Sequence, residues 1–336
     1  MFIVDAHLDL AYNKLRGRDI TRPAAEQPFV QNETATVGLP DLRTGNVGLI
    51  CATIFAMPKT EREAGYVTAD EAQLAGWEQL QYYLKLLAAG EIDFVTEPSE
   101  VPDRAGISAA IPAILLMEGA DPLRSPEDLG MWYDAGLRII GLAWRRTRYA
   151  GGTGEPGPLT AAGRELVPAI DKLGILHDTS HLAEESFWNL LDLATGPVFA
   201  SHSNCRAFVP TDRQLSDEMI KALVARGGVI GINYFDKFLL RPEVYKTRRA
   251  TLDDVAEHMD HICQLAGNHH HVGIGTDMDG GLGREHIPHE LTTAADLHKL
   301  APALRNRGLN DAAVTDIMGG NFARFFRKNL PTRARS

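Results

Sequence analysis

A chain of 336 residues with 44% hydrophobic side chains can bury a large core, as one large α/β domain or two ordinary ones. Its net charge of -10 argues against a nucleic-acid surface or an anionic membrane, because phosphates favour clustered lysine and arginine. Three widely spaced cysteines without a CxxC pair indicate free thiols in a reducing compartment. No apolar run reaches about 18 residues, so we expect a cytoplasmic protein with no nucleic-acid or membrane partner.

Buried strands and amphipathic helices alternate along the chain. Residues 70–90 follow a helical pattern closed by Gly90, and Ser125 and Thr160 mark the starts of further helices. A weak extra strand is expected at residues 92–95. Eight stronger apolar runs predict buried strands that begin near residues 2, 47, 111, 137, 175, 197, 228 and 271.

Eight parallel strands with intervening helices predict a (β/α)8 TIM-type barrel, formed as a single metallohydrolase domain over residues 1–336. A doubly wound open sheet is the alternative topology. The polar stretch from Arg16 to Arg43 contains three prolines and has no sustained period. We expect it to be a long functional loop over a strand end.

Histidines and carboxylates recur where the predicted strands end. The runs ILHDTSH and PVFASHS flank a helical segment and finish at His181 and His202, so these imidazoles come at equivalent ends of two parallel strands. Active sites of (β/α)8 barrels lie at the carboxyl ends of the strands. Six candidate ligands fall on this rim: His7, Asp9, Glu118, His181, His202 and Asp277.

Three imidazoles and three carboxylates suit a borderline metal such as zinc better than magnesium or calcium, which take oxygen ligands. The set exceeds the needs of one tetrahedral zinc, and it predicts two metals that share a carboxylate and activate a bridging water. HDTSH is not a helical zinc pair, because Asp178 stands where that motif needs glutamate. A single histidine at a strand end is usually structural, so the prediction depends on all six residues coinciding.

The remaining histidines are expected to have other roles. His177 lies deeper than His181 on the same strand face and is expected to be in the core or to support the ligands. His258 and His261 lie on a predicted helix and are expected at the surface. The run at residues 269–271 precedes a strand and is expected at the inactive end of the barrel.

Eight motifs, in order along nearly the whole chain, resemble those of the membrane (renal) dipeptidase family, binuclear zinc peptidases of the amidohydrolase-like barrel group. The resemblance implies hydrolysis of a dipeptide, including one with a D-residue at the second position, by a metal-bridging hydroxide. The motifs are DAHLDL (5–10), MEGADPL (117–123), LGILHDTSH (173–181), VFASHSNCRA (198–207), PTDRQLSDEMI (210–220), GVIGINYF (228–235), GIGTDMDG (273–280) and GGNFARFF (319–326).

Carried over residue by residue, the resemblance implies two Zn²⁺ ions, or similar divalent metals. His7 and Asp9 would hold one ion, His181 and His202 the other, and Glu118 would bridge both.

The resemblance also assigns substrate contacts. Arg213 matches the family arginine that takes the C-terminal carboxylate, and Asp277 matches the aspartate that carries a proton to the leaving amine. One departure concerns strand 4, where the family has a histidine in an L-T-H segment and this chain has Trp144. Arg145 and Arg148 follow it, and we expect them to contact the substrate and to favour anionic dipeptides or N-acyl amino acids.

Two other functions stay open. The missing histidine is compatible with an amidohydrolase of N-acyl amino acids or lactones that uses the same two metals. A metal-binding homologue without catalysis is the non-enzymatic alternative, against which Arg213 and Asp277 argue, since a structural metal site needs neither. Homodimers are common among soluble enzymes, and the resemblance is compatible with one.

Overall fold

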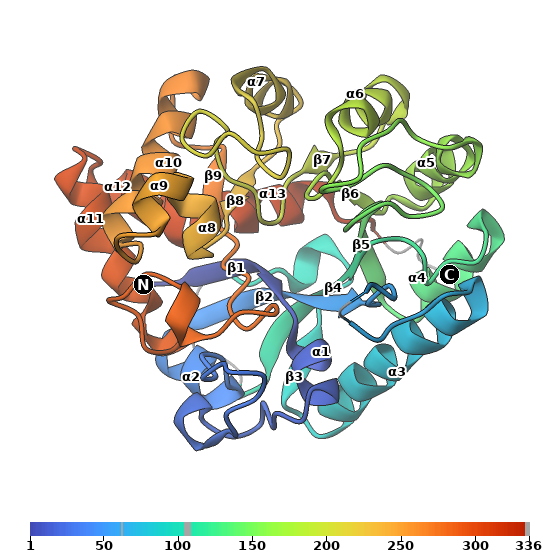
Figure 1. Ribbon diagram of the computed structural model, residues 1–336, viewed down its shortest axis with the longest axis horizontal. Helices are drawn as coiled ribbons and strands as arrows, with labels where there is room; N and C mark the ends of the chain where they lie inside the picture. Colours follow the sequence, from blue (N-terminus) through green and yellow to red (C-terminus); the bar gives the residue numbers. More distant parts are fainter. Residues whose placement is uncertain (62, 104–108, 333–336) are drawn as a thin grey trace.

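Eight parallel strands form a ring in the computed structural model, which describes residues 1–61, 63–103 and 109–332. The order around the ring is β7-β6-β5-β4-β2-β1-β9-β8 (Figure 1). The ring closes where Ala200 pairs with Ile230 and the N–H of Gly231 donates to the Ala200 carbonyl at 2.8 Å. This confirms the predicted barrel of eight strands and rules out the open sheet.

The strands match the predicted apolar runs, and the weak ninth strand, β3, pairs with β4 outside the ring. Continuous burial explains the lack of alternation, because barrel strands are covered on both faces. The strands are β1 (Ile3–Leu8), β2 (Val47–Phe55), β3 (Ile92–Phe94), β4 (Ile111–Glu118), β5 (Leu137–Gly141), β6 (Leu176–Asp178), β7 (Val198–Phe199), β8 (Ile230–Ile232) and β9 (Val272–Ile274).

Helices surround the ring of strands (Figure 1). No helix among the described residues is long and apolar enough to cross a membrane. The helices are α1 (Leu10–Leu15), α2 (Leu39–Thr44), α3 (Ala69–Ala88), α4 (Leu129–Asp134), α5 (Ala161–Leu173), α6 (Glu184–Leu193), α7 (Asp217–Ala225), α8 (Asp236–Leu239), α9 (Pro242–Tyr245), α10 (Leu252–Ala266), α11 (Leu300–Asn306), α12 (Asp311–Thr315) and α13 (Asn321–Asn329).

Local signals explain where the longer helices begin and end. The Thr68 hydroxyl accepts from the N–H of Glu71 at 3.3 Å, and the Glu71 carboxylate accepts from the N–H of Thr68 at 3.0 Å, a capping box that begins α3. Thr160 caps α5 as predicted, and Gly174 ends that helix at φ 68°. The stretch from Arg16 to Arg43 is less irregular than predicted, since α2 begins within it.

Aromatic packing closes the amino-terminal end of the barrel. Phe322, Phe325 and Phe326 of α13 pack with apolar residues of the strand interior, and the Phe199 and Phe326 rings lie edge to face, 5.8 Å apart. The barrel interior is also closely packed farther along the strands, because a Cβ on Gly275 would lie 1.8 Å from the Ser201 carbonyl oxygen. The carboxyl-terminal end of the barrel is therefore the end that can hold a site.

Candidate active site

The six predicted rim residues converge at the carboxyl ends of the strands. His7 lies in β1, where an irregular register between Asp5 and Leu8 turns the strand, and Asp9 follows as the residue before α1. Glu118 is the last residue of β4. The others follow their strands within three residues, and His181 and Asp277 have φ of 65° and 59°.

Glu118 lies between two groups of nitrogen and oxygen atoms. Its Oε1 is 3.2 Å from His181 Nε2 and 3.3 Å from His202 Nε2, while its Oε2 is 3.6 Å from His7 Nε2. Asp9 Oδ2 also lies 3.6 Å from His7 Nε2. Within each group, Glu118 with His181 and His202 or Glu118 with His7 and Asp9, the ligand atoms lie within 4.8 Å of one another.

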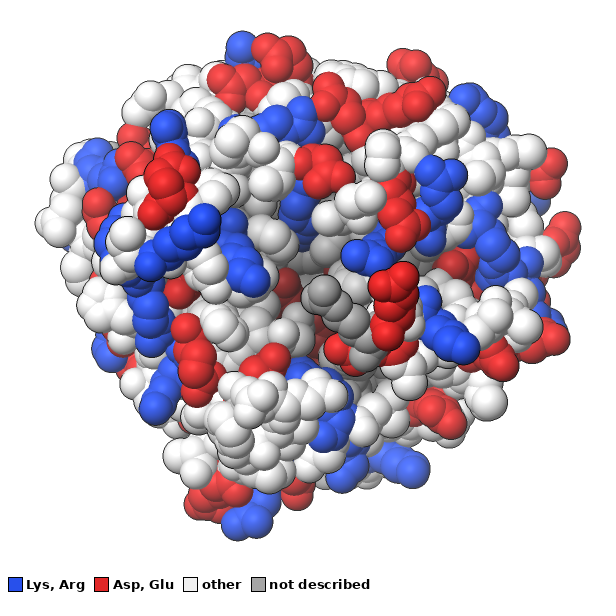
Figure 2. Space-filling model, viewed as in Figure 1, with Lys and Arg blue, Asp and Glu red and all other residues white. Residues whose placement is uncertain are grey.

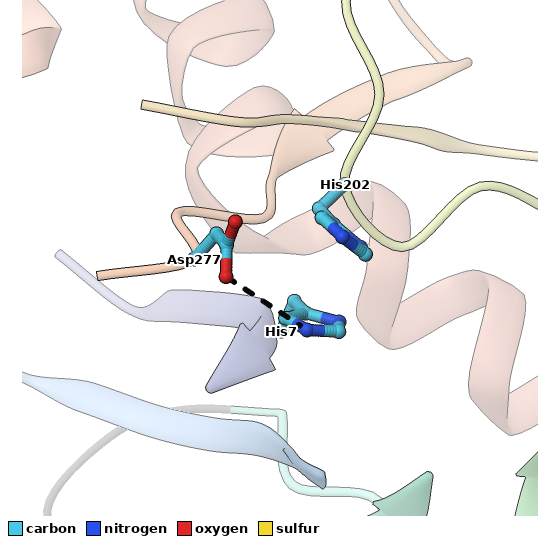
Figure 3. A group of neighbouring side chains, drawn as sticks. All are labelled: His7, His202 and Asp277. Atoms are coloured by element: carbon cyan, nitrogen blue, oxygen red, sulfur yellow. Dashed lines mark ion pairs between the residues drawn. The ribbon is translucent and has the colours of Figure 1, made fainter. Parts of the chain in front are cut away.

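The side chains of His7, His202 and Asp277 are turned toward one another (Figure 3). The rings of His7 and His202 are 3.6 Å apart between centroids, and Asp277 Oδ1 lies 4.0 Å from His7 Nε2. These three also form a group with ligand atoms within 4.8 Å. The two main groups are therefore contiguous.

Two hydroxyls orient the imidazoles. Ser201 Oγ lies 3.2 Å from Nδ1 of His7 and 2.7 Å from Nδ1 of His202, and it donates to Asp178 Oδ2 at 2.5 Å. Because the serine proton goes to Asp178, the hydroxyl oxygen accepts from both Nδ1–H groups. Thr153 Oγ1 lies 3.0 Å from Nδ1 of His181. These contacts leave the Nε2 atoms facing the centre, and the sequence analysis missed both hydroxyl residues.

Burial and charge set the protonation of the cluster. Burial lowers the pKa of His181 to about 4 and that of His202 well below its ordinary value, so both imidazoles are neutral. Burial also opposes the charge on His7, but Glu118 and Asp9 raise its pKa well above the ordinary value. Burial raises the pKa of Glu118, yet the charge of His7 and the contacts with the surrounding imidazoles hold it well below normal.

The donor set fits divalent metal ions. His7 Nε2 and Asp9 Oδ1 are buried without a hydrogen-bond partner among the described residues. Glu118 and Asp9 raise the pKa of the fully buried His7 imidazole, so the imidazole holds a proton. A metal cation bound at this position can take the place of that proton. Neutral imidazoles, oriented through Nδ1 by hydroxyls and surrounded by carboxylates, are the ligands that zinc and similar metals take.

A hydrogen bond from Asn233 fixes the position of the Asp277 carboxylate, and burial changes its pKa. Its Oδ2 accepts from Asn233 Nδ2 at 2.8 Å, and burial raises its pKa to about 8. A Cβ on Gly280 would lie 1.9 Å from Asp277 Oδ1 and 2.7 Å from Asp9 Oδ2. Only glycine at position 280 lets the backbone approach both carboxylates this closely.

Arg213 is buried beside the same cluster. Its Nη2 donates to the His202 carbonyl at 2.5 Å and its Nη1 to Ser203 Oγ at 3.1 Å, while Nε has no hydrogen-bond partner among the described residues. The guanidinium carbon lies 5.3 Å from the centre of the Phe238 ring, which lines the cavity above the cluster. The arginine is thus fixed by protein contacts and keeps a free donor.

A cavity of about 730 Å³ opens over the cluster. The face in Figure 2 is hollowed near its centre, and acidic side chains are visible inside the hollow. The cavity walls come from loops that follow six different strands. They include Asp9, Tyr12, Arg16, Gln31, Asn32, Glu33, Phe55, Met57, Glu63, Glu118, Trp144, His181, Phe235, Phe238, Asp277, Gly280, Gly281 and Leu282.

Trp144 is part of the wall of the cavity above the cluster, whereas Arg145 and Arg148 are not. Trp144 lines the cavity, with its ring 6.3 Å from that of His181 and 5.1 Å from that of Phe55. Arg145 faces an adjoining cavity, 3.7 Å from Glu155. Arg148 lines neither cavity, because its Nε donates to Asp121 Oδ1 at 3.1 Å and its Nη2 donates to the carbonyls of Asp121 and Leu123.

The other histidines lie outside the cluster. His177 is buried 2.7 Å from Asp171, which agrees with the predicted core position. The prediction that His258 is at the surface is wrong: it is 1% exposed and accepts from the N–H of Cys205 at 3.0 Å. His269 and His270 lie beside Asp316, before β9, as expected for the inactive end.

Known proteins are similar to this chain in sequence or in fold. A Klebsiella pneumoniae protein, described only as uncharacterised and lying in the region 5′ of pqqA, is 30% identical over 263 residues, 75% of this chain and 94% of its own. Dipeptidase AC, a family M19 metallopeptidase, superposes with a TM-score of 0.83 at 25% identity over 99% of both chains. A Rhodobacter sphaeroides metallopeptidase bound to a phosphinate mimic of L-Ala-D-Ala gives 0.81 at 25% identity, over 98% of this chain and 99% of its own.

The family model described as membrane dipeptidase, peptidase family M19, matches residues 1–335. That range includes every strand of the barrel and the whole histidine and carboxylate cluster. The chain therefore belongs to the membrane dipeptidase family, peptidase family M19, and is a hydrolase of the metallo-dipeptidase class.

Proposed function

We propose that this chain is a two-metal dipeptidase whose ions are held on either side of Glu118. The observation that carries the proposal is the position of that carboxylate, with Oε1 toward His181 and His202 and Oε2 toward His7. One ion would take His7 and Asp9 and the other the two remaining histidines. Zinc or a similar divalent metal bound there activates water and polarises a carbonyl.

The chain's own residues supply the remaining steps. Asp277 accepts a proton in the cavity and returns it to the leaving amine, since burial raises its pKa to about 8, near the working range of a general acid and base. Asn233 keeps the other oxygen of that carboxylate in place. The fixed guanidinium of Arg213 takes the C-terminal carboxylate of the dipeptide through its free donor.

The stereochemistry at the second residue is part of the proposal. The Rhodobacter sphaeroides relative is bound to a mimic of a dipeptide whose second residue is D. On the strength of that similarity, we propose that this chain also accepts a D-residue at the second position and hydrolyses L-D dipeptides in addition to L-L dipeptides. Arg145 faces the adjoining cavity and Arg148 is held by Asp121, so neither arginine has a role in the proposal.

A panel of dipeptides tests the proposal. The metal-loaded protein is incubated with L-D and L-L dipeptides and, separately, with N-acyl amino acids lacking a free amine. The proposal requires turnover of dipeptides that disappears on chelation and returns with added zinc. Turnover confined to the N-acyl compounds would reject it.

A second candidate function comes from Trp144. The indole occupies the cavity wall 6.3 Å from the His181 ring, where the family resemblance expects a histidine. An indole can donate one hydrogen bond to a substrate carbonyl, but unlike an imidazole it cannot take up a proton and become a cation, so it stabilises a developing oxyanion less. The alternative is an amidohydrolase of N-acyl amino acids or lactones that uses the same ligands, and the panel above separates the two.

A further inference from the structure

Arg16 is a buried cation in the cavity wall with an unused donor nitrogen. Its side chain is 7% exposed, and it lines the cavity above the cluster. Nε donates to Gln31 Oε1 at 2.8 Å and Nη2 to Glu33 Oε2 at 2.9 Å. Nη1 is buried and has no hydrogen-bond partner among the described residues. A desolvated N–H group of a guanidinium is costly to leave unpaired.

The surroundings of Arg16 fix it in place. Val30 and Glu33 pair across a tight turn whose two central residues, Gln31 and Asn32, have φ of 52° and 64°. Such a turn is rigid, and it presents the Gln31 and Glu33 side chains to the guanidinium. The Tyr12 ring lies 5.5 Å from the guanidinium carbon. The contacts with Gln31, Glu33 and Tyr12 all leave Nη1 free.

The carboxylate that pairs with Arg16 leaves Nη1 available to a second anion. The Glu33 carboxylate also lies 3.7 Å from Nη2 of Arg18. Arg18 neutralises part of its negative charge, so Glu33 repels the carboxylate of a substrate less strongly. Glu63 also lines the cavity, but it is exposed and its charge is screened by solvent. A hydrogen bond from a guanidinium to a carboxylate is about twice as strong as one to a neutral acceptor.

The position of Arg16 indicates which part of a dipeptide it meets. Arg16 follows β1 and Arg213 follows β7, and the ring order places these strands three apart across the barrel. A dipeptide whose C-terminal carboxylate lies at Arg213 extends its first residue away from β7. The first side chain is thus the part of the substrate that reaches the β1 side of the cavity.

We propose that Arg16 is a specificity-determining residue that binds the carboxylate of an acidic side chain on the amino-terminal residue of the dipeptide. The inference rests on the proposed dipeptidase function and adds a substrate class to it, aspartyl and glutamyl dipeptides. The inference also assigns the selection of anionic substrates to Arg16, which follows β1, in place of Arg145 and Arg148, which follow β5.

Matched dipeptides test the inference with the metal-loaded full chain. Glu-Ala is compared with Gln-Ala, and Ala-Glu with Ala-Gln, so each pair differs by one charge at nearly constant shape. For the wild type we expect kcat/KM for Glu-Ala to exceed that for Gln-Ala by about tenfold or more, with no comparable ratio in the Ala-Glu pair. In Arg16→Gln the first ratio should fall to about one.

Arg22→Gln is the control, because it removes the same charge from the same connection at a side chain that is 58% exposed and paired with Glu26. It should keep the wild-type ratio. If Arg16→Gln does not fold, the ratio of kcat/KM for Glu-Ala to that for Gln-Ala is measured in Arg16→Lys and in the wild type, and these two values still test the inference. A wild-type ratio near one, or a preference that appears only at the second residue, overturns the inference. If no dipeptide is hydrolysed by the wild type, the proposed function fails instead.

Discussion

Ser201→Ala should weaken metal binding at both halves of the site. The hydroxyl contacts Nδ1 of His7 at 3.2 Å and Nδ1 of His202 at 2.7 Å, and these imidazoles belong to different halves of the cluster. Removing one such supporting contact lowers metal affinity about 10- to 100-fold, or about 1.4 to 2.7 kcal/mol. The substitution also removes the 2.5 Å hydrogen bond that Ser201 Oγ donates to Asp178 Oδ2. We therefore expect some loss of folding stability as well.

The assay is competition of zinc between the protein and a chromophoric chelator, with thermal unfolding measured in parallel. Ser186→Ala is the control, because Ser186 is equally buried and its hydroxyl bonds to backbone groups of Gly151 and Gly157. The control should retain wild-type affinity. If Ser201→Ala folds and binds zinc within about twofold of the wild type, the hydroxyl does not orient the ligands and the reasoning is refuted.

Two further predictions concern catalysis and pH. Asp277→Asn should lower turnover by orders of magnitude with metal content retained, and unchanged rates would support a binding role instead. Burial lowers the pKa of His258 from 6.5 to about 4. The unfolded chain therefore takes up this proton first, so the contribution of His258 to the free energy of unfolding is fully present above pH 6.5 and falls by up to about 3 kcal/mol toward pH 4. His258→Gln should flatten that fall, as measured by urea unfolding; an equally steep fall would contradict it.

The barrel and its rim could be predicted because both leave local signals. The strands lie in mainly apolar runs, and β6 and β9 end within three residues of a histidine or an aspartate. Since parallel strands end at one edge, sequence position alone placed Glu118 near His202. Distances such as 3.3 Å between them depend on the register of neighbouring strands, which the pattern does not state.

Contacts made by ordinary polar residues could not be predicted. Ser201 adjoins His202 in the sequence, yet only the pairing of β6 and β7 brings Asp178 to its hydroxyl. Arg16 lies in a polar stretch and gains its role from a turn 15 residues away. The misplaced His258 did carry a signal, because it falls on the face of α10 that also holds Met259 and Ile262.

The resemblance directed attention to Arg145 and Arg148, neither of which lines the cavity above the cluster. Arg145 and Arg148 were expected near the substrate because they follow the strand that lacks the family histidine. Arg148 is instead held by Asp121 and by backbone carbonyls, so it stabilises the loop. The side chains that follow a strand by a few residues can turn away from the barrel axis, and the direction depends on loop hydrogen bonds rather than on spacing.

Metal stoichiometry tests the central claim most directly. The full chain is loaded with zinc, freed of loosely bound ions by gel filtration and analysed for zinc by mass spectrometry, alongside Glu118→Ala. The account predicts two equivalents per chain in the wild type and a loss from both halves when the shared carboxylate is removed. One equivalent or fewer in the wild type, or two equivalents retained without Glu118, would contradict it.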